Sequence, residues 1–148
     1  MRKYSITIDQ NARTYSDAVE WSIARLHNIT RTAHDSSRYD LHSDVEAGNK
    51  RISVKTSRFT LMSGTLCKGY TEFDKIWELY EATTHSNVFA YGTQDGTVYE
   101  MDIKEFKSFV YKFCQLEKDS SKNGGNAKIR AKRENKEMRE WLERAALA

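Results

Sequence analysis

Two strand-like runs in the first third of the chain carry residue types that could hydrolyse phosphodiesters. Asp40 and Asp44 belong to the first run, Ser53 and Lys55 belong to the second, and Gly48 lies between them. Side chains alternate along a strand, so Asp40 and Asp44 are expected to share one face. Ser53 and Lys55 share a face of the return strand for the same reason. Because glycine suits tight turns, we expect a hairpin that brings Asp40 near Lys55.

Carboxylates beside an ammonium group supply what metal-assisted phosphodiester hydrolysis requires. The carboxylates hold Mg²⁺ or Mn²⁺ with its waters, and the lysine orients the attacking water or offsets charge that develops on the phosphate. Asp40 and Lys55 are the pair that we assign to this chemistry. Asp44 lies closer to Ser53 in the expected hairpin, so the identity of the metal-binding aspartate stays open. An ordinary cross-strand ion pair between Asp40 and Lys55 explains the same pattern.

The order of these residues resembles the PD-(D/E)XK nuclease superfamily. In that family a helix that carries Glu is followed by a hairpin with a metal-binding Asp and then by a (D/E)-x-K tripeptide on the return strand. The matching residues are Glu20, Asp40 and Lys55, and the likeness covers about residues 15–92. Among the branches, the chain is most similar to archaeal-type Holliday-junction resolvases and related small endonucleases. The resemblance implies a restriction-endonuclease-like fold, a Mg²⁺ or Mn²⁺ cofactor and a DNA substrate.

Ser53 departs from the family pattern, because Asp or Glu usually occupies its position. A hydroxyl is a weaker metal ligand than a carboxylate. Some restriction enzymes of the superfamily are similar in carrying Ser-x-Lys, and they recruit a Glu from the next helix, where this chain has Glu72 and Asp74. The residues that the resemblance implies for catalysis and metal binding are Asp40, Lys55, Ser53, Glu20 and Glu72. They would form a divalent-metal-dependent DNA endonuclease, either resolvase-like or restriction-like.

The serine also supports an alternative reading of the same scaffold. The site would then be inactive, and the protein would bind nucleic acid without cutting it. Such a protein would inhibit or recruit a nucleic-acid enzyme for a phage or mobile element, which implies a protein partner.

The net charge of +3 conceals an uneven distribution of charge along the chain. Residues 1–70 and 122–148 are basic, whereas residues 71–107 are acidic. Cations in the two basic regions could contact phosphates, which gives sequence-independent and salt-sensitive binding. The candidate nucleic-acid-binding residues are Lys50, Arg51, Arg58, Lys128, Arg130, Lys132 and Arg133. An ordinary solvated surface, with the C-terminal cations paired to Glu134 and Glu137, is the alternative.

Other classes of site have little support in the sequence. The four histidines lack a zinc-binding spacing, and neither cysteine belongs to a Cys-x-x-Cys pair. Ser63-Gly64-Thr65 lacks the Gly-Lys-Ser/Thr of a Walker loop. Cys67 and Cys114 are therefore expected to be reduced thiols. No run has the length and apolarity of a membrane span, so we expect a cytoplasmic protein with no membrane partner.

Apolar residues three or four positions apart predict four helices. These are expected at about 15–27, 71–82, 102–113 and 131–146. Polar residues at capping-box spacing support the first three starts. The pairs are Thr14 with Asp17, Thr71 with Asp74, and Asp102 with Glu105.

Strand patterns fill most of the remaining chain. Residues 38–45 and 51–56 form the expected hairpin, preceded by a weak strand at 29–33, and residues 58–62 are expected to extend its sheet. Residues 87–92 and 97–101, joined by Gln94-Asp95-Gly96, carry the strongest hairpin signal. Residues 3–9 alternate as a strand or an N-terminal arm.

These elements predict an α/β or α+β fold in which helices flank a mixed sheet. A chain of 148 residues can bury a substantial core without disulfides. We place a nuclease-like core at 1–121 and a basic segment with a C-terminal helix, packed on the core or extending from it, at 122–148. DNA is the expected partner. The sequence leaves a homodimer open, and its only visible interface would be the aromatic stripe of Phe106, Phe109 and Phe113.

Overall fold

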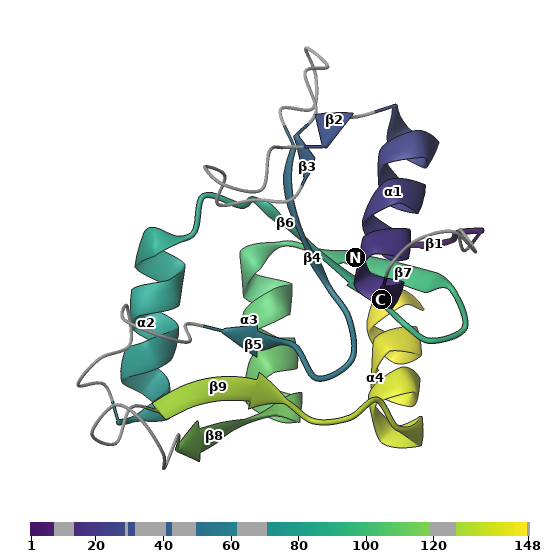
Figure 1. Ribbon diagram of the computed structural model, residues 1–148. Helices are drawn as coiled ribbons and strands as arrows, with labels where there is room; N and C mark the ends of the chain where they lie inside the picture. The colour runs from purple at the N-terminus through teal and green to yellow at the C-terminus, as the bar shows by residue number, and fades with distance from the viewer. Residues whose placement is uncertain are drawn as a thin grey trace.

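The computed structural model is a mixed α/β fold in which helices cover a large β-sheet (Figure 1). It describes residues 1–7, 14–28, 30–31, 41–42, 50–61, 71–118 and 127–147. The predicted fold class, a mixed sheet flanked by helices with a further helix at the C-terminus, is confirmed.

Among the described residues, the large sheet has six strands in the order β1-β7-β6-β4-β3-β2. Their bounds are Arg2–Ser5, Thr97–Met101, Val88–Gly92, Arg51–Lys55, Leu41–His42 and Thr30–Arg31, in that order. In the described part of this sheet, β4 and β6 pair in parallel and the other neighbours are antiparallel. Parallel neighbours need a crossover, which here includes helix α2, Phe73–Thr83. The predicted Asp-Gly hairpin joins β6 to β7, with Gly96 at φ 85° as its turn requires.

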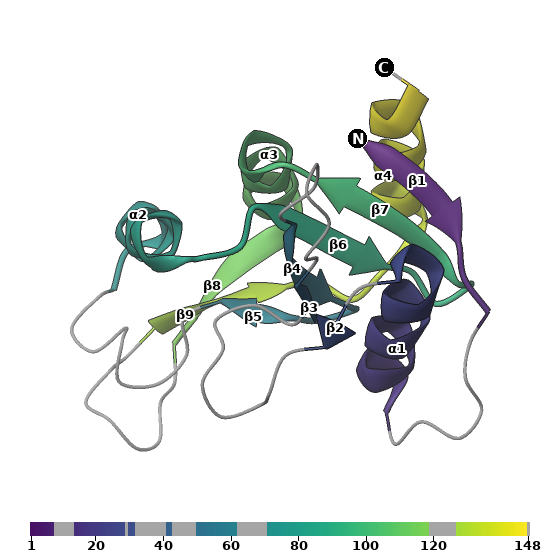
Figure 2. The ribbon, with the colours of Figure 1, turned by 90° about the horizontal axis from the view of Figure 1, so that it is seen from above.

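Helices cover both faces of this sheet. Helix α1, Tyr15–His27, packs Val19 and Ile23 against Ile52 and Val54 of β4. Helices α2 and α3, the latter Ile103–Phe113, cover the opposite face, as the view from above shows (Figure 2). There the Phe89 ring of β6 stacks on a phenylalanine of α3 at 4.5 Å between ring centroids. The catalytic candidates on β4 therefore lie in the middle layer of the fold.

A second, antiparallel sheet joins β5, β9 and β8, which span Thr60–Leu61, Ala127–Ala131 and Cys114–Lys118. The prediction that 58–62 extends the first sheet was wrong, because β5 pairs with β9 instead. Ile129 of β9 and Met138 and Leu142 of helix α4, Lys136–Leu147, are fully buried in the same core as α2 and α3. The described residues of β9 and α4 therefore pack on this core.

The predicted helix starts had different outcomes. Thr14 accepts a hydrogen bond from the Asp17 N–H, and Asp102 forms a full capping box with Glu105, as predicted. Helix α2 instead starts one residue after Glu72, and Asp74 accepts a hydrogen bond from the Tyr111 hydroxyl at 2.8 Å. The last helix begins at residue 136 rather than 131, because β9 occupies residues 127–131.

The structure buries the aromatic stripe of α3 and exposes two large apolar side chains of α1. The aromatic stripe is at most 3% exposed, so it forms the core and offers no interface for a second copy. On α1, Trp21 and Leu26 are 42% and 54% exposed. Trp21 lies on the side of the helix away from Val19, and Leu26 borders an open pocket beside the end of β1 rather than a packed neighbour.

Candidate functional site

Strand β4 presents Ser53 and Lys55 to one face of the large sheet, as the alternation predicted. In the parallel register Ser53 lies beside Phe89, and Lys55 lies beside Tyr91, so these side chains share a face. The two apolar residues of β4 face α1 on the other side. Ser53 is only 7% exposed, whereas Lys55 is partly buried at the carboxyl end of the strand.

The partner strand of the predicted hairpin is described only at two positions. Leu41 pairs with Ile52, and His42 pairs with Arg51, so β3 and β4 are antiparallel neighbours. Asp40 and Asp44 lie outside the described residues.

The two glutamates proposed as metal ligands project from helices on opposite faces of the sheet. Glu20 is partly buried on α1, which covers the face opposite Ser53 and Lys55. Glu72 is exposed at the N-cap of α2, which covers the same face as Ser53 and Lys55. Within the described part of the chain, no three His, Cys, Asp or Glu residues are grouped so as to hold a metal ion.

Four of the seven candidate nucleic-acid-binding residues have protein partners. The Lys50 Nζ lies 3.5 Å from the buried Glu100 carboxylate. The Arg51 Nε donates to the His85 carbonyl at 2.5 Å. Lys128 and Arg130 share one face of β9, and both lie within 4.0 Å of Glu117 on β8. Their charges are therefore wholly or partly offset within the fold.

The other three candidates, Arg58, Lys132 and Arg133, are exposed and lie close together in the fold. No described residue forms an ion pair with them. Arg58 lies in the turn between β4 and β5, and the cations at 132 and 133 directly follow β9. The Ala131 N–H donates to the Phe59 carbonyl at 2.8 Å, which joins the two segments. We call Arg58, Lys132 and Arg133 the basic patch.

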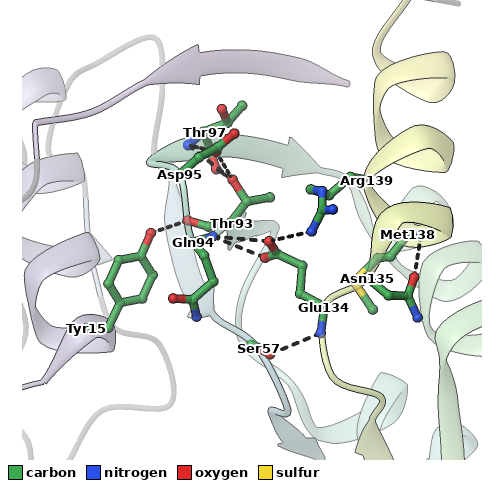
Figure 3. A network of polar contacts seen from close by, with 10 residues as sticks. All are labelled: Tyr15, Ser57, Thr93, Gln94, Asp95, Thr97, Glu134, Asn135, Met138 and Arg139. Atoms are coloured by element: carbon green, nitrogen blue, oxygen red, sulfur yellow. Dashed lines mark hydrogen bonds and ion pairs between the residues drawn. The ribbon is translucent and has the colours of Figure 1, made fainter.

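Glu134 holds the segment after β9 in place (Figure 3). Its carboxylate side chain is only 4% exposed, accepts the Gln94 N–H at 3.1 Å and lies 3.5 Å from the Arg139 guanidinium. Its own N–H donates to the Ser57 hydroxyl at 3.2 Å. The alternative that Glu134 would pair with the neighbouring basic run is therefore wrong, since its ion-pair partner is on α4. The other acid of that alternative, Glu137, lies 4.0 Å from Lys112 of α3.

The residues around Glu134 hold neighbouring elements of the fold together. The Tyr15 hydroxyl donates to the Thr93 carbonyl, which ties α1 to the β6–β7 turn. In that turn the Thr93 hydroxyl donates to Asp95, and this bond holds the pKa of Asp95 below its usual value. Burial and the nearby Glu134 carboxylate raise the pKa of Tyr91, so its phenol stays protonated near neutral pH. The network thus fixes the turns at the carboxyl ends of β4 and β6.

Sequence reasoning did not identify this network, because its members are distant in the chain. Glu134 contacts residues 40 and 77 positions away. One local signal was present, since Asn135 caps the Met138 N–H at 2.8 Å and so marks the true start of α4. With that cap recognised in the sequence, residues 131–134 would not have been assigned to the helix.

No protein-family model matches the chain, and no curated protein and no solved structure matches it. Among the described residues, no helix has both the length and the apolarity to cross a membrane. The function of the chain is therefore inferred from its own residues and their geometry.

Proposed function

We propose that the chain is a divalent-metal-dependent DNA endonuclease, resolvase-like or restriction-like, with its active site on the Ser53–Lys55 face of β4. One observation carries the proposal. The elements follow in the order α1, β3, β4, α2 and β6, with Ser53 and Lys55 on one face of the strand between the antiparallel β3 and the parallel β6. This is the order of helix, hairpin, helix and strand that the resemblance to PD-(D/E)XK nucleases implies.

The register of the hairpin supports Asp40 as the metal-binding aspartate. We propose that the pairing of Leu41 with Ile52 continues by one position, which makes Ser53 the partner of residue 40. Directly paired residues share a face of the sheet, so Asp40 would join Ser53 and Lys55.

The oxygen donors in this proposal suit a hard cation such as Mg²⁺ or Mn²⁺. Asp40 supplies one carboxylate, Glu72 supplies a second from the helix on the same face, and Ser53 supplies a hydroxyl. Glu20 belongs to α1, on the other face of the sheet. A variant of Glu20 therefore tests whether α1 contributes a metal ligand. The metal, when bound, polarises the phosphate and acidifies a water molecule. Lys55 orients that water or offsets the charge that develops on the phosphate.

Cleavage assays on the whole chain test this proposal. Supercoiled plasmid and a four-way DNA junction are incubated with the protein and Mg²⁺ or Mn²⁺. We expect metal-dependent cutting that is lost in Asp40→Asn and Lys55→Ala. The matched control is Lys75→Ala, which removes an exposed lysine of α2 that lies 3.7 Å from Glu78. Cutting that survives Lys55→Ala contradicts the assignment of the site.

A second function is favoured by Ser53 itself. A buried hydroxyl replaces the usual carboxylate, and the described residues hold no ready metal-binding group. The protein would then bind nucleic acid without cutting it, and would inhibit or recruit a nucleic-acid enzyme of a phage or mobile element. Calorimetric titration with Mg²⁺ separates the two functions. Mg²⁺ binding that Asp40→Asn abolishes favours the nuclease, whereas DNA binding without Mg²⁺ binding favours the second function.

A further inference from the structure

We infer that the basic patch, Arg58, Lys132 and Arg133, binds the phosphate backbone of a nucleic acid, and that the Ser57–Glu134 contact positions it. The choice of nucleic acid as the partner rests on the proposed function. The location of the binding surface rests on the structure alone.

The first step of the argument is how the fold assembles the patch. Arg58 is more than seventy residues away from Lys132 and Arg133 in the chain. Thr60 pairs with Arg130, and the Ala131 N–H donates to the Phe59 carbonyl. The same antiparallel alignment continues toward Arg58 on one segment and Lys132 on the other. The backbone positions of three cations from two basic regions of the sequence are thus neighbours in the fold.

The second step is that these cations are available to a ligand. The four other candidate cations lie beside Glu100, Glu117 or a backbone carbonyl. The basic patch is exposed, and within the described ranges it has no acidic partner. The nearest acid in sequence, Glu134, is buried and pairs with Arg139. A polyanion can therefore approach the patch without displacing an internal ion pair.

The third step is the backbone of Arg58, which lies in the left-handed region at φ 61°. This conformation is costly for residues other than glycine. Non-glycine residues in such conformations cluster at ligand-binding and active sites, where the surrounding structure maintains them. The turn therefore keeps an arginine where glycine would be less strained, which is consistent with a role for its side chain.

The fourth step is the distance to the proposed active site. Arg58 follows Lys55 by three residues, so their Cα atoms are at most about 11 Å apart. Along the helix axis of duplex DNA, that length corresponds to about three base-pair steps. The patch is therefore close enough to the carboxyl end of β4, where Lys55 lies, for one short segment of DNA to contact both.

The last step concerns the residues that position the patch. The Ser57 hydroxyl, next to Arg58, accepts the N–H of Glu134, next to Arg133. The buried Glu134 carboxylate in turn accepts the N–H of Gln94 (Figure 3). Removing the Ser57 hydroxyl changes no charge, so any loss of binding in Ser57→Ala reports on the arrangement of the cations. Ser57 is a positioning residue in this inference.

The main experiment measures binding to fluorescein-labelled duplex and single-stranded DNA by anisotropy, without divalent metal, over a range of NaCl concentrations. The variant Arg58→Gln/Lys132→Gln/Arg133→Gln should weaken duplex binding more than tenfold at low salt. Its slope of log K against log salt should be smaller in magnitude by about 2 to 3, as expected for three lost phosphate contacts. The control Lys75→Gln/Lys104→Gln/Lys107→Gln removes the same charge from α2 and α3 and should change the slope little.

A second experiment tests the positioning role. Ser57→Ala should weaken DNA binding several-fold while its far-UV circular dichroism stays unchanged. The control Ser108→Ala removes a serine whose hydroxyl donates to the Lys104 carbonyl on α3, and it should bind DNA as the unmodified chain does. Binding by Ser57→Ala equal to that of the control would overturn the positioning role.

Three outcomes would overturn the assignment of the patch. The first is an equal loss of binding in the two triple variants, and the second is an absence of DNA binding by the unmodified chain. The third is tighter binding to phosphatidylserine vesicles than to DNA, which would identify an anionic membrane as the partner. Because the assay contains no metal and measures no cleavage, salt-dependent DNA binding supports the patch even where the nuclease proposal fails.

Discussion

At the scale of single residues, substitutions of Arg58 should affect stability and the proposed DNA binding in different ways. A left-handed conformation costs an L-residue about 1–2 kcal/mol, and glycine avoids this cost but loses about 0.5–1 kcal/mol of backbone entropy on folding. We therefore expect Arg58→Gly to raise the free energy of unfolding by up to about 1 kcal/mol, and to weaken DNA binding. Urea denaturation and DNA-binding anisotropy measure the two effects.

Arg58→Gln is the matched control, because it removes the charge but keeps the Cβ and hence the strain. It should weaken DNA binding as much as Arg58→Gly does, with a change in stability of less than about 0.5 kcal/mol. Equal stabilities of the glycine and glutamine variants would show that the strain in this turn is no larger than the entropy cost of glycine, about 0.5–1 kcal/mol.

His27, at the end of α1, gives a second prediction at this scale. Its ring lies 3.3 Å from the buried Glu100 carboxylate and also faces Lys50, Arg2 and Tyr4. Burial lowers the pKa of His27 below its ordinary value, and it outweighs the opposing attraction of Glu100. Below pH about 6.5 the unfolded chain takes up a proton that the folded chain resists. His27 therefore makes stability fall as the pH drops below that value.

The variant His27→Gln removes this titration. Between pH 7.0 and 5.5 the free energy of unfolding should fall less in the variant than in the unmodified chain, by up to about 1 kcal/mol. Urea denaturation at several pH values gives the two slopes. His85→Gln, at an exposed position, is the control for replacing a histidine by glutamine. A slope unchanged by His27→Gln contradicts the prediction.

At the scale of elements, the contact between α1 and β6 depends on Gly92. A Cβ at this position would lie 3.0 Å and 3.2 Å from the two γ-methyl groups of Val19. Val19 is fully buried and β-branched, so it has little freedom to move aside. Gly92→Ala should therefore lower the free energy of unfolding by about 1–3 kcal/mol, as overpacking does.

A double-mutant cycle with Val19→Ala checks the cause. In the Val19→Ala background the new methyl group has space, so Gly92→Ala should cost at least about 0.5 kcal/mol less there. Urea denaturation of the four proteins gives the coupling energy. Additive effects would show that the loss in Gly92→Ala arises from the backbone and not from the contact with the helix.

The elements that the sequence predicted well are those whose signals are local. Helices α1 and α3 have both a cap and an apolar stripe, and the hairpin β6–β7 has Asp95-Gly96 at its turn. The second sheet was not predicted, since the pairing of Thr60 with Arg130 depends on contacts across seventy residues. No short window of sequence contains that information.

The same difference between local signals and contacts of distant residues applies to the candidate site. Alternation placed Ser53 and Lys55 on one face of β4, which the register with β6 confirms. The separation of the basic residues into paired and exposed sets depended on Glu100 and Glu117, which are distant in sequence from the cations that they offset. Sequence could name the cations but could not distinguish the two sets.

At the scale of the whole molecule, the C-terminal helix is part of the main core. Leu142 of α4 is fully buried in the same cluster as Trp77 of α2 and Phe106 of α3. Leu142→Ala should therefore lower the free energy of unfolding of the entire chain by about 2–5 kcal/mol. The transitions followed by far-UV circular dichroism and by tryptophan fluorescence should shift together to lower urea, as expected for one cooperative unit.

The control for this prediction is Leu147→Ala in the same helix, at a side chain that is 85% exposed. It should change the free energy of unfolding by less than about 0.5 kcal/mol. If α4 were an appendage, Leu142→Ala would shift only a minor transition and leave the main one in place. The basic patch directly precedes α4, so its position depends on a helix that unfolds with the core. DNA binding by Leu142→Ala should therefore be lost over the same range of urea as its circular dichroism signal.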